Sequence, residues 1–283
     1  MTRAVVIGGR GTLGSALAAG LPAEGYEVVA ATTRAECDIT RQADLGALLA
    51  RTQPEVVFNA AAYTDVDKAE LEPDVAWTAN AIAPEALARA CRDRGVALVH
   101  YSTDFVFDGE LERPYDEFDP PSPQGLYARS KVAGDRLVAA AWERSFIMRV
   151  GCLYGRGGRN FPSTILRRLR AGETVRADAG RLGSPTWVRD VVRVSAALAK
   201  TRHYGLYHCT SAGETTWSDY AAFLAAEIGA PAGRVQAVPT AELPMRAMRP
   251  RRAILENRML RLRGLDTMPD WREAARAFIA SES

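Results

Sequence analysis

The sequence predicts an α/β protein built on a doubly wound, parallel Rossmann-type sheet, with a smaller α/β substrate lobe toward the C-terminus. Short runs rich in Val, Ile and Ala alternate with amphipathic segments rich in Ala, Leu and Arg over the first 150 residues. This alternation is typical of repeated right-handed βαβ units. A glycine-rich turn follows the first apolar run, where such a sheet binds the diphosphate of a dinucleotide.

The expected elements of this sheet follow from the apolar period. Strands are expected at Ala4–Ile7, Glu27–Ala31, Glu55–Asn59, Ala97–Tyr101 and Phe146–Val150. Helices are expected between them at Leu13–Leu21, Leu45–Arg51, Ala79–Arg94 and Ala128–Trp142. We therefore predict a dinucleotide-binding domain over residues 1–150.

The alternation loosens after about residue 150. Further elements are expected as a basic helix at Phe161–Arg170, helices at Asp190–Lys200, Trp217–Ile228 and Trp271–Ile279, and a strand at Gly205–Cys209. We predict that residues 151–283 form mainly a substrate lobe, and that about 188–210 return to the first domain.

Composition excludes several classes of function. The chain has 283 residues and a net charge of +2, which gives no reason to propose nucleic acid as a partner. No apolar run is long enough for a membrane span, and the N-terminus lacks the apolar core of a signal peptide. The four cysteines lack the spacing of metal ligands. We expect a cytoplasmic protein without a metal, and the sequence is compatible with a homodimer.

The glycine turn is the first candidate site. Its glycines at positions 8, 11 and 14 suit a tight turn, a close approach of backbone to a diphosphate, and packing of the following helix. A purely structural turn would show the same pattern, but its place after the first strand favours a cofactor. The candidate residues are Gly8, Arg10, Gly11, Thr12, Leu13 and Gly14.

The end of the second expected strand indicates which coenzyme is used. Thr33 and Arg34 stand there, and no acidic residue follows at the place of a ribose-binding carboxylate. A hydroxyl and a guanidinium suit a 2′-phosphate, and Arg10 could join them. We expect NADPH; NADH stays open, because Arg34 could equally be a solvated loop residue.

Tyr127 and Lys131 form the candidate reaction centre. Four residues apart on a helix, they share one face. A nearby ammonium is expected to lower the pKa of a tyrosine toward the working range, which suits a residue that protonates a carbonyl oxygen. An ordinary surface helix is the alternative explanation.

Three further blocks resemble the dTDP-4-dehydrorhamnose reductases, a branch of the extended short-chain dehydrogenase/reductases. They are Asn59–Glu70, Tyr101–Gly109 and the Tyr127–Lys131 segment, and Gly183–Thr186 and Gly205–His208 add to the likeness. The resemblance implies NADPH-dependent reduction of the C4 keto group of a nucleotide-linked, dTDP-type 4-keto-6-deoxyhexose.

The resemblance also implies roles for single residues. Thr103 would hold the substrate carbonyl, Tyr127 would donate the proton, and Lys131 would bridge the nicotinamide ribose and tune the tyrosine. Asp38 and Ile39 would lie beside the adenine, and Ala60, Ala61 and Tyr63 would line the cofactor. Substrate contacts are expected from Ser102, Asp104, Val106, Cys152, Asn160 and Arg167, although Ser102 and Thr103 could simply cap the next segment and Arg167 could lie on a solvated helix face.

Two departures from the family pattern concern the sugar. The family commonly has a tryptophan in the sugar pocket where this chain has Cys152, and a serine near the C-terminus is replaced within Arg249–Leu255. The identity of the sugar is therefore open, and a reductase that makes another deoxysugar fits equally well.

Three other functions share parts of this sequence pattern. A 4,6-dehydratase would need a glutamate where Phe105 follows Thr103 and Asp104, so dehydration is not expected. A nucleotide-sugar 4-epimerase would use the same Tyr127 and Lys131 and stays open. So does a non-catalytic regulatory subunit, a role this fold serves in the beta subunit of methionine adenosyltransferase.

Overall fold

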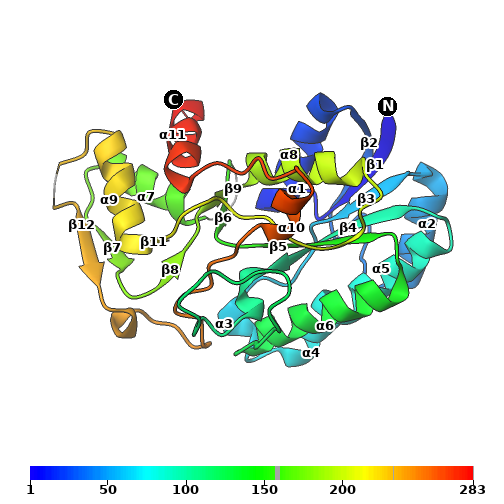
Figure 1. Ribbon diagram of the computed structural model, residues 1–283, viewed down its shortest axis with the longest axis horizontal. Coiled ribbons are helices and arrows are strands. Elements are labelled where there is room, and N and C mark those ends of the chain that lie inside the picture. Colours follow the sequence, from blue (N-terminus) through cyan, green and yellow to red (C-terminus); the bar gives the residue numbers. More distant parts are fainter. Residues whose placement is uncertain (157–159, 232, 283) are drawn as a thin grey trace.

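A parallel sheet of six strands forms the centre of the computed structural model, which describes residues 1–156, 160–231 and 233–282 (Figure 1). The strand order is β10-β5-β4-β3-β1-β2, and every neighbouring pair is parallel. The strands are β1 (Thr2–Ile7), β2 (Tyr26–Thr32), β3 (Val56–Asn59), β4 (Ala97–Thr103), β5 (Ser145–Val150) and β10 (Gly205–His208). The predicted fold class is confirmed, and the strand order reverses between β1 and β3, where such sheets bind ligands.

Helices cover both faces of this sheet (Figure 1). They are α1 (Thr12–Gly20), α2 (Gln42–Thr52), α3 (Val66–Ala69), α4 (Pro73–Trp77), α5 (Ala83–Arg92), α6 (Leu126–Ala141) and α8 (Val188–Ala199), with short helical turns η1 (Leu21–Glu24), η2 (Thr78–Ile82) and η3 (Asp104–Val106). Alternate residues of one strand serve opposite faces, as Val6 packs in the core with α1 and α8 whereas Val5 packs with α2 and α5. Burial on both sides explains the continuous apolar runs in the sequence.

Most of the remaining elements gather at one end of the sheet, whereas one of them, α10 (Arg258–Leu262), packs beside β10 (Figure 1). They are β6 (Leu153–Tyr154), α7 (Phe161–Arg170), β7 (Val175–Asp178), β8 (Leu182–Gly183), β9 (Thr186–Trp187), β11 (Thr215–Thr216), α9 (Trp217–Glu227), β12 (Val235–Val238), η4 (Thr240–Glu242), α10 (Arg258–Leu262) and α11 (Trp271–Ser281). Three two-stranded pairs, β12-β7, β11-β8 and β6-β9, replace the long sheet here. One cluster of buried side chains runs from Val6 in the sheet to Tyr220 and Phe278 in this end, so the two parts share a core.

The sixth strand comes from beyond residue 150. β10 pairs with β5 from Gly205 against Phe146 to His208 against Arg149, and α8 packs on α1. The chain therefore returns to the sheet at the residues expected from the sequence. The division into a dinucleotide-binding domain and a substrate lobe stays a prediction.

The expected helix Ala79–Arg94 differs from the observed one in its first turn. Helical backbone begins at Pro73 and passes through the wider π-helical turn of η2 before α5. The carbonyl of Asn80 in that turn faces Gly134 of α6, where a Cβ atom would lie 2.0 Å from it. Close packing against α6 thus accompanies a turn that periodicity alone does not predict.

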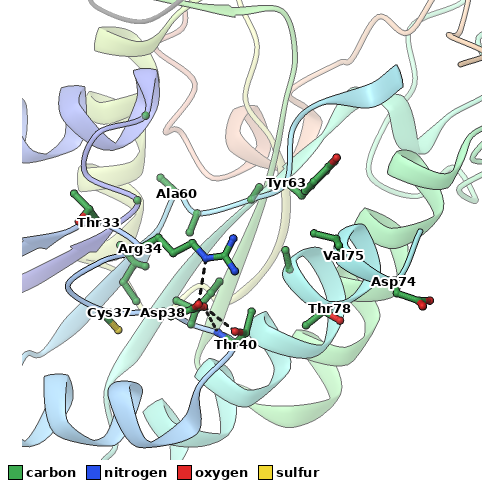
Figure 2. Close-up of a pocket in the computed structure, with 17 residues that line it drawn as sticks. Thr33, Arg34, Cys37, Asp38, Thr40, Ala60, Tyr63, Asp74, Val75 and Thr78 are labelled. Atoms are coloured by element: carbon green, nitrogen blue, oxygen red, sulfur yellow. Dashed lines mark hydrogen bonds and ion pairs between the residues drawn. The ribbon is translucent and has the colours of Figure 1, made fainter. Parts of the chain in front are cut away.

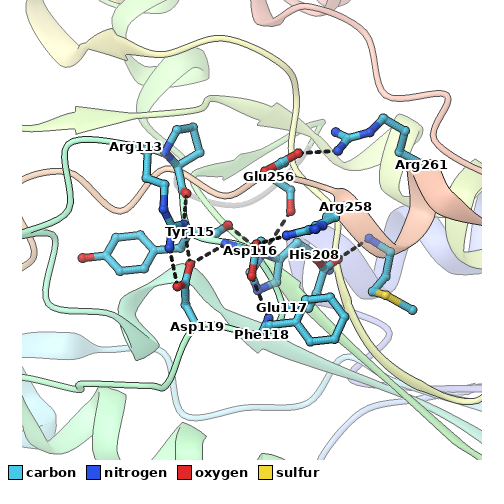
Figure 3. A network of polar contacts seen from close by, with 12 residues as sticks. Arg113, Tyr115, Asp116, Glu117, Phe118, Asp119, His208, Glu256, Arg258 and Arg261 are labelled. Atoms are coloured by element: carbon cyan, nitrogen blue, oxygen red, sulfur yellow. Dashed lines mark hydrogen bonds and ion pairs between the residues drawn. The ribbon is translucent and has the colours of Figure 1, made fainter.

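The loop after η3 is fixed to the C-terminal part of the chain by charged residues (Figure 3). Glu117 accepts hydrogen bonds from the backbone N–H groups of His208 and Met259, at 2.9 and 3.1 Å. Asp116 lies 2.6 Å from the guanidinium of Arg258. These contacts connect residues far apart in sequence and hold the loop beside the end of β10.

Across the described residues, none of the helices combines the length and apolar character needed to cross a membrane.

Candidate active site

The glycine turn has the tight geometry expected of it. Gly8 has φ of +84°, and a Cβ atom there would lie 2.8 Å from the backbone nitrogen of Ala61. A Cβ atom at Gly14 would lie 2.0 Å from the carbonyl oxygen of Gly8. Gly11 is the N-cap of α1, so the start of this helix faces the cavities on either side. The turn can bring backbone N–H groups close to an anionic ligand.

A cavity of about 510 Å³ lies at the carboxyl ends of β1, β2 and β3 (Figure 2). It brings together nine of the residues expected to bind the cofactor: Gly8, Gly11, Thr33, Arg34, Asp38, Ile39, Ala60, Ala61 and Tyr63. Its mixed lining of backbone, apolar and charged groups can hold an adenosine and a phosphate.

Two charged residues of this cavity, Arg34 and Asp38, are paired with each other. Nε of Arg34 lies 3.1 Å from Oδ2 of Asp38, and the arginine side chain is 80% exposed. Glu36 accepts hydrogen bonds from the backbone nitrogen and the hydroxyl of Thr33. These bonds, with a smaller effect of Arg10, lower the pKa of Glu36. The carboxylate of Glu36 therefore lies beside Thr33, one of the residues expected to bind the coenzyme.

A second cavity, of about 520 Å³, adjoins the first and shares Gly11, Ala60 and Ala62 with it. It contains the three expected catalytic residues, Thr103, Tyr127 and Lys131, together with Thr12, Leu13, Ser102, Asp104, Cys152 and Asn160. The end of β4 supplies Thr103, and the first two turns of α6 supply Tyr127 and Lys131. The structure thus places all three residues around one cavity, and their roles stay a prediction.

Tyr127 differs from the expectation in its acidity. Burial raises its pKa to about 12, while a hydrogen bond with Thr103 acts in the opposite direction. Nζ of Lys131, which borders the same cavity, donates a hydrogen bond to the backbone carbonyl of Tyr101 at 2.7 Å. The phenol is therefore protonated at neutral pH because loss of solvent outweighs the nearby polar groups.

Asp104 shares the buried floor of this cavity with Thr103. The hydroxyl of Thr103 donates to Oδ1 of Asp104 at 3.0 Å and accepts from the backbone nitrogen of Phe105. Burial raises the pKa of Asp104 to about 7. A Cβ atom at Gly151 would lie 2.5 Å from Oδ2 of this carboxyl, so the glycine leaves room for it.

Cys152 and Asp104 connect the second cavity to a third, of about 210 Å³. The other residues around the third cavity are Phe105, Arg181, Leu182, Trp217, Pro250 and Ala253. Cys152 adopts φ of +50°, and its sulfur would lie 2.7 Å from a Cβ atom at Gly183. Cys152 and Trp217 thus border the same third cavity.

Four expected site residues lie away from the cavity walls. Val106 is buried with Phe107 in a separate core cluster. Arg167 is exposed in the last turn of α7, and Arg10 is exposed in the glycine turn. Gly14 packs against Gly8 and serves the turn. The structure does not bring Val106 or Arg167 to the catalytic residues.

Sequence reasoning missed Asn80, which supports the site from behind. Its side-chain oxygen accepts from the backbone nitrogen of Tyr63 at 2.8 Å, and its nitrogen donates to the carbonyl of Tyr63 and the hydroxyl of Ser130. It fixes the cofactor-side loop to α6. A buried-face asparagine between alanines was the only signal in the sequence.

Comparison with known proteins agrees with this geometry. The family model described as RmlD substrate binding domain matches residues 2–283. A dTDP-4-dehydrorhamnose reductase of Streptomyces griseus is 38% identical over 278 residues, which cover 96% of this chain and 91% of that protein. A dTDP-4-keto-6-deoxy-D-glucose reductase of Streptomyces niveus is 38% identical, with 96% and 94% covered. The crystal structure of dTDP-4-dehydrorhamnose reductase from Bacillus anthracis in complex with NADP has a TM-score of 0.95 and 34% identity, with 99% of each chain covered.

Proposed function

The chain belongs to the RmlD substrate binding domain family, and on this premise we propose that it reduces the C4 keto group of a dTDP-linked 4-keto-6-deoxyhexose with NADPH. One observation carries the proposal: Thr103, Tyr127 and Lys131 line a cavity that adjoins the cavity at the glycine turn. A dinucleotide that spans both would have one end beside the catalytic residues and the other beside Arg34.

The residues present fit a dinucleotide. Gly8 has no Cβ atom that would fill the turn, and Arg34 and Thr33 offer a cation and a hydroxyl for a 2′-phosphate. When bound, NADPH supplies a hydride from its nicotinamide ring. The cofactor-binding roles of these residues are part of the proposal.

The chain's own residues then have distinct tasks. The hydroxyl of Thr103 orients the substrate carbonyl, and Tyr127 gives its proton to the oxygen as negative charge develops there. A phenol whose pKa is about 12 holds that proton throughout the neutral range. Lys131 would hold the nicotinamide ribose of the bound coenzyme, and the positive charge of its ammonium would stabilise the phenolate that remains.

Substrate contacts are assigned to the connected second and third cavities. Ser102, Asp104 and Cys152 border the path between the reacting carbon and the ring of Trp217. Asn160 caps α7 at the edge of the same space. A hexose ring with its reacting carbon at Tyr127 would extend toward Cys152.

Stoichiometric consumption of NADPH tests the proposal. Purified protein is mixed with NADPH and a dTDP-4-keto-6-deoxyhexose, and loss of nicotinamide absorbance is followed together with the product sugar. One NADPH oxidised for each sugar reduced is expected. Interconversion of sugars with no net NADPH loss would instead identify an epimerase, and NADPH binding with neither change would identify a regulatory protein.

A further inference from the structure

Helix α6 carries a third polar residue on the face of Tyr127 and Lys131, and it has no part in the mechanism above. Asp135 follows Lys131 by four residues, so the three side chains occupy successive turns of one face. We infer that Asp135, held by Arg149, is a positioning residue that keeps Lys131 protonated in the active site. The inference rests on the proposed function for its catalytic meaning.

The group is buried. Lys131 is 1% exposed and Asp135 is 5% exposed. Oδ2 of Asp135 lies 3.3 Å from Nε of Arg149 on β5, and both side chains of that pair are buried. A buried ammonium needs a compensating anion nearby, because loss of solvent disfavours its charged form.

Asp135 interacts with both buried cations. Burial raises its pKa, and the charges of Arg149 and Lys131, together with hydrogen bonds from Ser102 and Arg149, oppose that rise. Its contact with Arg149 is made through Oδ2, at 3.3 Å from Nε, whereas a carboxylate that served only to fix a guanidinium would be expected to make a two-point contact. The ionised carboxylate is therefore shared between the guanidinium and the ammonium.

Asp135 is the charged group that favours the protonated form of Lys131. Burial lowers the pKa of Lys131 to about 8, and Asp135 opposes that change. On the neighbouring strand β4, His100 is buried and its pKa lies well below the usual value, so it adds no charge. Without Asp135 the surroundings would hold two buried cations, Lys131 and Arg149, and only the lysine can lose its proton at neutral pH.

The other titratable groups on this side do not replace Asp135. Tyr127 is a neutral phenol. Asp104 on η3, whose pKa is about 7, accepts a hydrogen bond from Thr103 and raises the pKa of Tyr127. Next to Arg149 on β10, burial keeps His208 neutral by lowering its pKa to about 3. Asp135 is thus the anion that the buried lysine depends on.

The chain offers a direct test because its only lysines are Lys68, Lys131 and Lys200. Protein with ¹³C-labelled lysine gives three Cε signals, and the variant Lys131→Met identifies one of them. In Asp135→Asn the titration midpoint of the Lys131 signal should fall by about one pH unit or more, whereas Lys68 and Lys200 should not move. An unchanged Lys131 midpoint would overturn the inference.

Two further variants complete the design. Asp135→Glu should restore the midpoint, and Glu143→Gln, which removes a charge from an exposed position just after α6, should leave it unchanged. If Asp135→Asn does not fold, the double variant Asp135→Asn with Arg149→Gln removes both members of the buried pair. The lysine lacks its anion there, so the midpoint should be lower than in the single variant Arg149→Gln, which differs from the double variant only in keeping Asp135.

Turnover separates this inference from the proposed function. In the active protein, the basic limb of the kcat/KM profile should move to lower pH in Asp135→Asn, in step with the Lys131 midpoint. A uniform loss of activity with an unmoved limb would assign Asp135 a merely structural role. If the unaltered protein reduces no sugar, the proposed function fails, while the lysine titration still decides the role of Asp135.

Discussion

The hydroxyl of Thr33 donates a 2.9 Å hydrogen bond to Oε2 of Glu36, at the mouth of the cavity beside the glycine turn. The guanidinium of Arg34, the next residue in the sequence, forms an ion pair with Asp38 instead (Figure 2). The site proposed for the coenzyme's 2′-phosphate thus contains an exposed cation, Arg34, and an anion, Glu36. Glu36 accepts the hydrogen bond that the hydroxyl of Thr33 could otherwise donate to the phosphate. Arg34 and Glu36 should act on coenzyme choice in opposite directions.

Substitution of each residue tests that opposition. Arg34→Ala should weaken NADPH binding more than NADH binding, because only NADPH has the 2′-phosphate. Glu36→Gln should strengthen NADPH binding relative to NADH, because one negative charge leaves the same place. Dissociation constants for both coenzymes, measured by nicotinamide fluorescence, give the comparison. Equal changes for the two coenzymes would remove both residues from the 2′-phosphate site.

The proton donor is tested by Tyr127→Phe. Loss of the phenolic proton should lower kcat by roughly 10²–10⁴-fold and leave NADPH affinity nearly unchanged. Single-turnover reduction of the keto sugar gives the rate, and coenzyme titration gives the affinity. Turnover equal to that of the unaltered protein would show that another group protonates the substrate.

Cys152 is expected to influence which sugar is accepted. Cys152→Trp would fill much of the third cavity, because Cys152 borders that cavity together with Trp217. The KM for the nucleotide sugar should rise while NADPH affinity stays the same, and Cys152→Ser is the matched control of similar size. A KM that does not change with side-chain volume would place the sugar elsewhere.

Asp104 should make stability depend on pH. Its pKa is raised to about 7 by burial, so the folded protein keeps a proton that the unfolded chain loses above its ordinary pKa. This contribution is fully present at low pH and is lost as pH rises toward 7. Asp104→Asn should therefore stabilise the protein at pH 8 by roughly 2–4 kcal/mol more than at pH 5.

Denaturant unfolding at the two pH values measures this difference. Asp93→Asn, at an exposed position after α5, is the control and should show little change with pH. If Asp104→Asn alters stability equally at pH 5 and pH 8, then Asp104 is ionised in the folded protein throughout that range.

The sequence was sufficient to predict the fold because strands buried on both faces leave continuous apolar runs. The spacing of apolar residues in the segments of α5 and α6 indicated helices equally clearly. The motif around Tyr127 indicated the family that the comparisons confirm. The structure places the expected catalytic residues in one cavity, although their roles stay predictions. Local sequence patterns are sufficient to predict a feature when the spacing of its residues is set by a single helix or strand.

Properties that depend on contacts between distant segments were not predictable. The acidity of Tyr127 is set by burial in the folded chain, which outweighs the lysine four residues away. Trp217, at the start of α9, borders the same cavity as Cys152, and no local pattern relates the two. Val106 follows the Ser-Thr-Asp block in sequence, but the turn of η3 directs it into the core.

The late arrival of β10 has a consequence for biosynthesis. Strand β5 has no neighbour on its outer side until Gly205–His208 pairs with it, so during translation the growing sheet presents an open parallel edge while the whole segment from β6 to α8 is being made. An exposed edge strand invites pairing with other chains. A fragment that ends at residue 150 should therefore aggregate when expressed, and stalling of the ribosome before residue 208 should be more harmful than stalling after it.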